Sequence, residues 1–424
     1  MSPNGFEYDI GFDNRGESMY ESPLVVRSTR FVRFHMIRRA FAEPVITGIS
    51  QTFVSIRNIR ATLLSPVDWK RTLASILLLL LAIPSHAGDD AQHEYLLFPS
   101  LELFDNTAPD DVLLDGGGYV GIADFMYSYS GNRLRILGEY VLSNEESHME
   151  RLKAGWLFGE QTMLWVGRFH QPSKYWTTEH HHGQYLQTSI SRPGIEEWED
   201  RGGAISTHIT GLMLETGQIR KDSSGYQIAV SAGFAPLLTQ DGLEPFELWD
   251  PSSDHGPAYN FRVTFLPDYF GNNQFGILGG WSELEVDRDN FASQPGTESV
   301  EQLQLGSYMD WRWEQLRIIF NMNYLQDKHI RPDGNFTDTF WSGYLQAEYA
   351  LGLYWTVYGR HENSFGEDGT GFIRLIPKLP SQKNLFGVRW DIATDHALTL
   401  EIADTKTETS DLDEYRLQWS AVFP

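Results

Sequence analysis

From Tyr95 onward, apolar and polar residues alternate along the chain in runs of about ten residues. Because successive side chains of a β-strand point to opposite faces, this period of two predicts strands with one apolar and one polar face. Similar runs predict roughly 14 to 17 strands, spaced about 20 residues apart. The clearest runs cover residues 134–142, 259–265, 303–311, 316–324 and 386–392.

A soluble β-sandwich also alternates, so strand length and the connections between strands must distinguish the two folds. Strands of about 10 to 12 residues exceed the usual length in globular sheets and match a tilted membrane crossing. Short connections such as 130–132 and 394–396 alternate with long polar ones such as 235–257, 285–299 and 363–382. We therefore predict an all-β fold: a closed, transmembrane antiparallel β-barrel of about 16 strands (range about 14–18).

Aromatic residues recur at the ends of the alternating runs, where membrane barrels carry their interfacial girdles. These residues are Tyr127, Tyr129, Trp156, Phe158, Trp311, Trp313, Tyr349, Trp355 and Trp419.

Composition excludes several classes of protein. The chain has 33 Lys and Arg against 57 Asp and Glu, which is too acidic for a nucleic-acid binder held by phosphate contacts. A mean hydropathy of −0.35 excludes a bundle of apolar membrane-spanning helices. The chain has no Cys, so it has no disulfide framework, thiolate zinc site or cysteine nucleophile.

One segment has the pattern of a secretory signal. Residues 67–87 combine a basic start at Lys70 and Arg71, an apolar run that includes five leucines, and the small residues Ser85 and Ala87. Because such a signal belongs at an N-terminus, we interpret residues 1–66 as a mis-called extension and expect cleavage near Ala87. The barrel is then residues 88–424.

The C-terminal segment Tyr415–Phe423 has apolar or small residues at every second position and Phe423 next to last. It resembles the terminal strand of Gram-negative outer-membrane proteins, and the mature chain as a whole resembles their porins. The resemblance implies an outer-membrane location in contact with lipid and lipopolysaccharide, and insertion by the barrel-assembly machinery. It also implies passive diffusion of small hydrophilic solutes, with a homotrimer as one assembly and with neither enzyme activity nor a cofactor.

The polar face of the strands would line the lumen of such a barrel. Charges of both signs at close quarters produce a transverse field that orients dipolar solutes and sets ion preference. A structural alternative is that Arg–carboxylate pairs only rigidify the interior. The predicted pore-lining residues are Arg133, Arg135, Glu139, Arg262, Asp310, Arg317, Arg389 and Asp391.

Residues 168–203 show no alternation of apolar and polar residues. This stretch is longer than a connection without a function of its own usually is. Its aromatic content argues against disorder. We therefore predict a loop that folds into or over the lumen and narrows it. Its candidate constriction residues are Tyr175, Trp176, His180, His182, Arg192, Glu199 and Asp200.

The three successive histidines of this segment raise the question of a metal site. Only His180 and His182 point to the same side of an extended chain, with Glu179 or His170 as a third ligand. Because no recognised spacing supports this set, we predict no metal there.

Two other functions stay open as alternatives to a channel. The segment His182-Gly183-Gln184 and Ser189-Ile190-Ser191-Arg192 is similar to the His and Ser region of outer-membrane phospholipases, but Gln184 stands where their nucleophilic Ser would be. A nucleophile also requires a His–Ser hydrogen bond with a third orienting group. The remaining alternative is a structural barrel without channel activity.

Overall fold

The computed structural model describes the chain from residue 91 onward, with gaps in the loops. The described residues are 91–107, 117–144, 147–180, 183–197, 203–239, 242–246, 248, 255–286, 296–366, 379–407 and 410–424. The predicted extension 1–66 and signal 67–87 lie outside the described residues, as do the candidate loop residues His182, Glu199 and Asp200.

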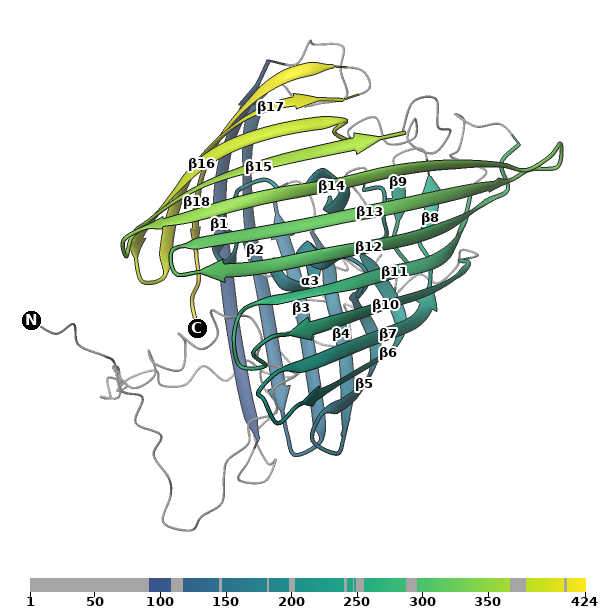
Figure 1. Cartoon of the computed structure of the whole chain (residues 1–424), viewed down its shortest axis with the longest axis horizontal. Coiled ribbons are helices and arrows are strands. Elements are labelled where there is room, and N and C mark those ends of the chain that lie inside the picture. The colour runs from purple at the N-terminus through teal and green to yellow at the C-terminus, as the bar shows by residue number, and fades with distance from the viewer. Residues whose placement is uncertain are drawn as a thin grey trace, which may run out of the picture.

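Sixteen antiparallel strands form one closed barrel, which confirms the predicted fold class. Each strand pairs with its sequence neighbours, and β1 closes the barrel against β18 with Ser100 opposite Ser420 (Figure 1). The strands are β1 (Gln92–Asn106), β2 (Gly117–Ser130), β3 (Leu134–Ser143), β4 (Ser147–Phe158), β5 (Thr162–His170), β6 (His208–Ile219), β7 (Gly225–Phe234), β10 (Pro257–Leu266), β11 (Gln274–Glu285), β12 (Ser299–Trp313), β13 (Leu316–Ile330), β14 (Phe336–Leu351), β15 (Trp355–Phe365), β16 (Gln382–Ala393), β17 (His396–Lys406) and β18 (Asp411–Ala421).

The two ends of the barrel differ in their connections. Turns such as 314–315, 352–354 and 394–395 join strands at one end, which we call the short-turn end. This end also holds the start of β1 and the end of β18, where Phe423 pairs with Leu97. The long connections emerge at the other, long-loop end, and one of them carries the two-stranded sheet of β8 (Leu237–Thr239) and β9 (Gly242–Glu244).

The outward face of the barrel is apolar and is bounded by two belts of exposed aromatic residues, the arrangement expected of a membrane-spanning barrel. The belt near the short-turn end contains Trp156, Phe158, Trp313, Tyr349, Trp355 and Trp390. The belt near the long-loop end contains Tyr119, Phe234, Tyr259, Trp341, Phe365 and Tyr415. Among the residues that the structure describes, no helix is long and apolar enough to cross a membrane.

The inner face is mixed rather than uniformly polar, which differs from the simple two-face expectation. Tyr308, Ile319, Phe340 and Tyr344 are almost completely buried and belong to one apolar cluster with Trp176 of the β5–β6 connection. An inner wall can be apolar where another segment covers it, because that contact removes apolar surface from water. The apolar residues of this part of the inner wall are therefore those that the β5–β6 connection covers.

Candidate functional site

We call the connection between β5 and β6, residues 171–207, the lumen loop. Its described residues, 171–180, 183–197 and 203–207, are folded and largely buried inside the barrel. It contains the short helix α3 (Tyr175–His180) and two 3-10 turns, η2 (Gln184–Leu186) and η3 (Gly194–Glu196). Lys174 holds the two ends of the loop together. Its buried Nζ donates to the carbonyl oxygens of Glu197 (2.7 Å) and Ile205 (3.2 Å) and to Thr207 Oγ1 (2.8 Å).

Glu196 of η3 is buried, and its carboxylate faces the backbone N–H groups at the start of α3. Burial raises its pKa, because a charged carboxylate loses solvation away from water. The charge of Lys174 and the backbone N–H groups of Tyr175, Trp176 and Thr177 act in the opposite direction. The loop therefore has internal polar contacts in addition to its contacts with the wall.

Aromatic stacking and charge fix α3 against strands β10 to β13. The ring of Tyr175 stacks on Tyr308 with centroids 4.3 Å apart, and the Tyr175 hydroxyl donates to Asp310 Oδ2 at 3.0 Å. Burial, together with the charge of Asp310, raises the pKa of Tyr175 well above its ordinary value, so the hydroxyl remains a donor. Glu179 pairs with Arg262 of β10 at 3.3 Å.

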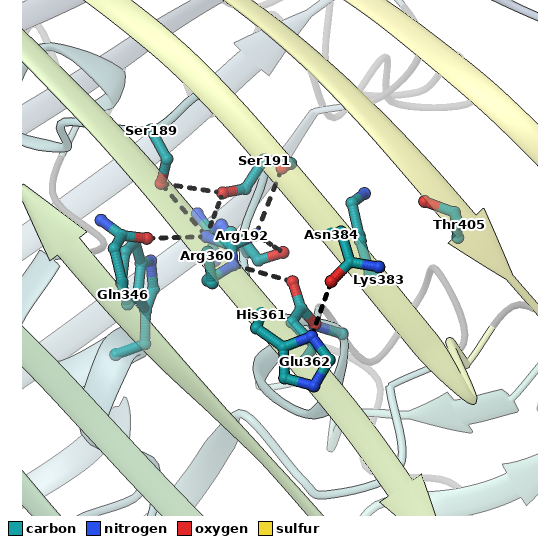
Figure 2. A network of polar contacts seen from close by, with 12 residues as sticks. Ser189, Ser191, Arg192, Gln346, Arg360, His361, Glu362, Lys383, Asn384 and Thr405 are labelled. Carbon is teal, nitrogen blue, oxygen red and sulfur yellow. Dashed lines mark hydrogen bonds and ion pairs between the residues drawn. The ribbon is translucent and has the colours of Figure 1, made fainter.

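Arg360 on β15 binds the following part of the loop (Figure 2). Its Nη1 donates to the carbonyl oxygen of Ser191 at 3.0 Å and its Nη2 to that of Arg192 at 2.8 Å. Glu362, two residues along the same strand, accepts from Arg360 Nε at 2.7 Å and from the backbone N–H of Gly194 at 2.6 Å. In Figure 2 His361 lies on the other side of the strand, where it contacts Asn384.

Glu401 on β17 and Arg389 on β16 complete the attachment. The carboxylate of Glu401 accepts the backbone N–H of Ile190 at 3.0 Å, together with the hydroxyl of Ser191. Arg389 donates to the carbonyl oxygens of Tyr185 and Gln187. The loop thus starts from β5, crosses the lumen and is bonded to the wall formed by β14 to β17.

A polar cavity of about 260 Å³ lies between the lumen loop and the short-turn end. Glu179, His180 and Thr188 of the loop line one side, and strand and turn residues line the other. The charged lining consists of five carboxylates and two guanidiniums: Glu179, Asp310, Glu314, Glu348 and Asp391, with Arg312 and Arg317. The cavity therefore presents both signs of charge with an excess of acid.

Several predicted wall residues meet the lumen loop or the cavity. Asp310, Arg317 and Asp391 line the cavity, while Arg262 and Arg389 bond to the loop. Glu139 pairs with Arg151 of β4 away from the cavity. Arg135 donates to the carbonyl oxygens of Gly131 and Leu134 at the short-turn end.

Arg133 is placed differently from its prediction, because it lies in the exposed turn between β2 and β3 rather than on a strand.

The candidate loop residues that the structure describes are all buried. Trp176 packs edge-on against Tyr344, and its ring lies near Arg360. His180 is within 3.3 Å of Arg317, so the loop histidine contacts an arginine. The carbonyl oxygen of Arg192 accepts from Arg360.

Sequence reasoning missed Arg360, Glu362, Lys174 and Glu196. Arg360 and Glu362 share one parity with Tyr358 and Ser364 in the run Trp355–Phe365, so extending the alternation argument to this run could have found them.

No protein-family model matches the chain, and no curated protein is detectably similar to it in sequence. Its structure, however, is similar to that of an anion-selective porin from Comamonas acidovorans, with a TM-score of 0.53 over 79% of this chain and 100% of the porin at 11% identity. The chain has the fold of outer-membrane porins.

Two further solved structures share this porin fold. A loop L8 deletion mutant of OmpT, an outer membrane protein of Vibrio cholerae, matches with a TM-score of 0.52, 10% identity and coverage of 79% of this chain and 100% of that one. The outer membrane channel DcaP of Acinetobacter baumannii matches with a TM-score of 0.51, 9% identity and coverage of 80% and 99%. At these identities the likeness concerns the fold, so function must be argued from this chain's own residues.

Proposed function

We propose that this protein is an outer-membrane channel for the passive diffusion of small hydrophilic solutes or ions. Backbone polar groups in lipid must pair internally, and a closed barrel does this without free edges. The apolar outer face and its two aromatic belts suit a bilayer with lipid and lipopolysaccharide around the barrel. The terminal strand with Phe423 is the segment that the barrel-assembly machinery would recognise.

The observation that carries this proposal is the lumen loop bonded across the barrel, with a charged cavity beside it. A barrel of sixteen strands has an interior wider than side chains alone can fill. A loop tied across it narrows that interior without closing the wall. Because carboxylates outnumber guanidiniums around the cavity, we expect the pore to favour cations over anions.

The test is electrical. The purified chain is inserted into a planar bilayer, and single-channel conductance and the reversal potential in a KCl gradient are measured. We expect stepwise ohmic conductance and a reversal potential shifted toward that of K⁺. In a matched variant, a short Gly-Ser linker replaces residues 175–195, and its conductance should be larger. A folded, inserted barrel without conductance in either form would contradict the proposal.

The hydrolase alternative is tested on the same preparation with phospholipid vesicles. The hydroxyl of Ser191 donates to Glu401, and that of Ser189 donates to the Ser191 carbonyl oxygen, so both are engaged in loop anchoring. Release of fatty acid that is lost in Ser189→Ala or Ser191→Ala would favour the enzyme over the channel. If the protein shows no hydrolysis and no conductance, the result favours a structural barrel without channel activity.

Export and assembly are part of the same proposal. N-terminal sequencing of the protein from outer-membrane fractions should give a mature end near Gly88. Cross-linking in detergent tests the homotrimer that the resemblance to porins implies.

A further inference from the structure

A second polar cluster lies where β4, β5 and β6 approach the long-loop end, away from the cavity. Its centre is the carboxylate of Glu150, whose side chain is 0% exposed. Oε1 of Glu150 lies 3.2 Å from Nε2 of His170 and 3.0 Å from Nε2 of His208, and both imidazoles are buried. Oε2 of Glu150 lies 2.8 Å from Nε2 of His148. Three histidines therefore converge on one buried carboxylate through the same ring nitrogen.

A β-bulge accounts for the placement of Glu150. The pairing of β3 with β4 shifts between Glu139 and Tyr140, which pair with Arg151 and Met149 and leave Glu150 as the extra residue. Bulges redirect side chains and are common beside functional sites. His170 and His208 face each other as the last registered pair of β5 and β6, with ring centroids 5.2 Å apart.

The ligand atoms of Glu150, His170 and His208 all lie within 4.8 Å of one another. Two imidazole nitrogens and one carboxylate oxygen form a common ligand set for Zn²⁺, with a fourth position for water. In a tetrahedral site with bonds of about 2.0 Å, neighbouring ligand atoms are about 3.3 Å apart. The two nitrogen–oxygen distances in this cluster are close to that value, so an ion could enter with small side-chain shifts.

The burial of Glu150 also favours a cation at this position. A fully buried carboxylate is costly unless a cation or hydrogen bonds accompany it. The neighbouring buried carboxylate of Glu139 already pairs with Arg151. His148, on the other oxygen of Glu150, is positioned to orient the ligating carboxylate, as outer partners do in metal sites.

We propose that Glu150, His170 and His208 bind one Zn²⁺ ion. His170 immediately precedes the lumen loop and His208 immediately follows it, so the ion links both ends of the loop to β4. The bound ion would thus cross-link the two ends of the lumen loop to β4. Binding of the ion does not depend on whether the pore conducts.

The test uses the full chain in detergent, stripped with EDTA and titrated with ZnCl₂ by calorimetry. We expect one equivalent of Zn²⁺ per chain. Glu150→Gln and His170→Ala should each weaken binding by about 10-fold or more, because a ligand is lost. His361→Gln is the matched control, because His361 lies on the opposite side of the barrel wall from the loop and contacts Asn384. It should bind as the wild type does.

A second measurement keeps the test informative where a variant fails to fold. Co²⁺ added to the stripped wild-type protein should give a visible absorption spectrum of histidine and oxygen ligation, which excess Zn²⁺ abolishes. The proposal is overturned if the wild type binds neither ion stoichiometrically, because the cluster is then only a hydrogen-bonded carboxylate. It is also overturned if His180→Gln abolishes binding while His170→Ala does not.

Discussion

Arg317 on β13 forms a two-point ion pair with Asp310 on β12, with Nε 2.9 Å from Oδ1 and Nη2 2.5 Å from Oδ2. The same guanidinium lies 3.5 Å from Glu348 and contacts His180 of the lumen loop. Arg317 therefore partly neutralises two of the carboxylates that line the cavity.

Replacing Arg317 with Met tests how this charge affects ion preference. The variant leaves Asp310 and Glu348 without their shared cation, so cation selectivity and single-channel conductance should both rise. The measurement is the reversal potential in a KCl gradient. Lys328→Met is the control, because it removes a positive charge from a half-exposed pair with Glu301 that does not line the cavity. Equal shifts in the two variants would refute a local effect.

Arg360→Met should release the lumen loop from β15. The change removes two hydrogen bonds to loop carbonyls and leaves Glu362 buried without its arginine, which should cost about 3–5 kcal/mol of stability. Urea unfolding in lipid vesicles, followed by tryptophan fluorescence, measures the loss. His361→Gln, the next residue on the other side of the strand, should change stability by less than about 0.5 kcal/mol.

The absence of cysteine allows the position of the loop to be mapped chemically. Ser189 in the loop is 1% exposed, whereas Leu353 in the β14–β15 turn is 85% exposed. A maleimide should therefore label Leu353→Cys faster than Ser189→Cys by roughly two orders of magnitude in the folded protein. In urea the two rates should become equal. Similar rates before unfolding would mean that the loop does not stay inside the barrel.

Leu345 tests which face meets the lipid. It is exposed on the same face of β14 as Trp341 and Tyr349, which belong to the two opposite aromatic belts, and it lies midway between them. An arginine there should cost about 2–4 kcal/mol, since the side chain sits near the bilayer midplane. Unfolding in vesicles provides the measurement. Phe270→Arg, in the exposed β10–β11 turn, serves as the control and should cost little.

Glu196 gives the loop a pH-dependent contribution to stability. Burial raises its pKa in the folded state, so folding favours the protonated form and this contribution declines as pH rises from the ordinary carboxyl range through the folded-state pKa. Glu196→Gln should therefore stabilise the protein more at pH 8 than at pH 5. Urea midpoints at the two pH values check this, with Glu197→Gln as a partly exposed neighbour. A gain that does not depend on pH would exclude the linkage.

The alternation of apolar and polar residues was sufficient to predict which side chains face inward in most of the barrel. The alternation in the run 316–324 places Arg317, Asn321 and Asn323 on one face, and these residues are directed inward in the structure. The same argument fails at Arg133, because a strand end cannot be located from parity alone and the residue falls in a turn.

The alternation of apolar and polar residues was less informative about the side chains that line the lumen. Tyr308 and Tyr344 occupy inward positions that a polar-lumen rule would not assign to aromatic residues, and only the packing of Tyr175 and Trp176 explains them. The cluster of Glu150, His170 and His208 was missed for a related reason. A bulge displaces Glu150, and the three ligands come from strands separated by a long loop.

The sequence by itself predicted a barrel of about 16 antiparallel strands, its apolar outer face and the break in alternation where the lumen loop begins. These features follow from side-chain period and turn chemistry, which act between near neighbours. Only the tertiary structure decided that Arg360, Glu362 and Glu401 would hold the loop and that His170 would meet His208 and Glu150. The contacts of the loop with the wall join residues about 200 positions apart, and closure of β1 against β18 pairs Ser100 with Ser420. A one-dimensional pattern carries no information about which such distant residues will meet.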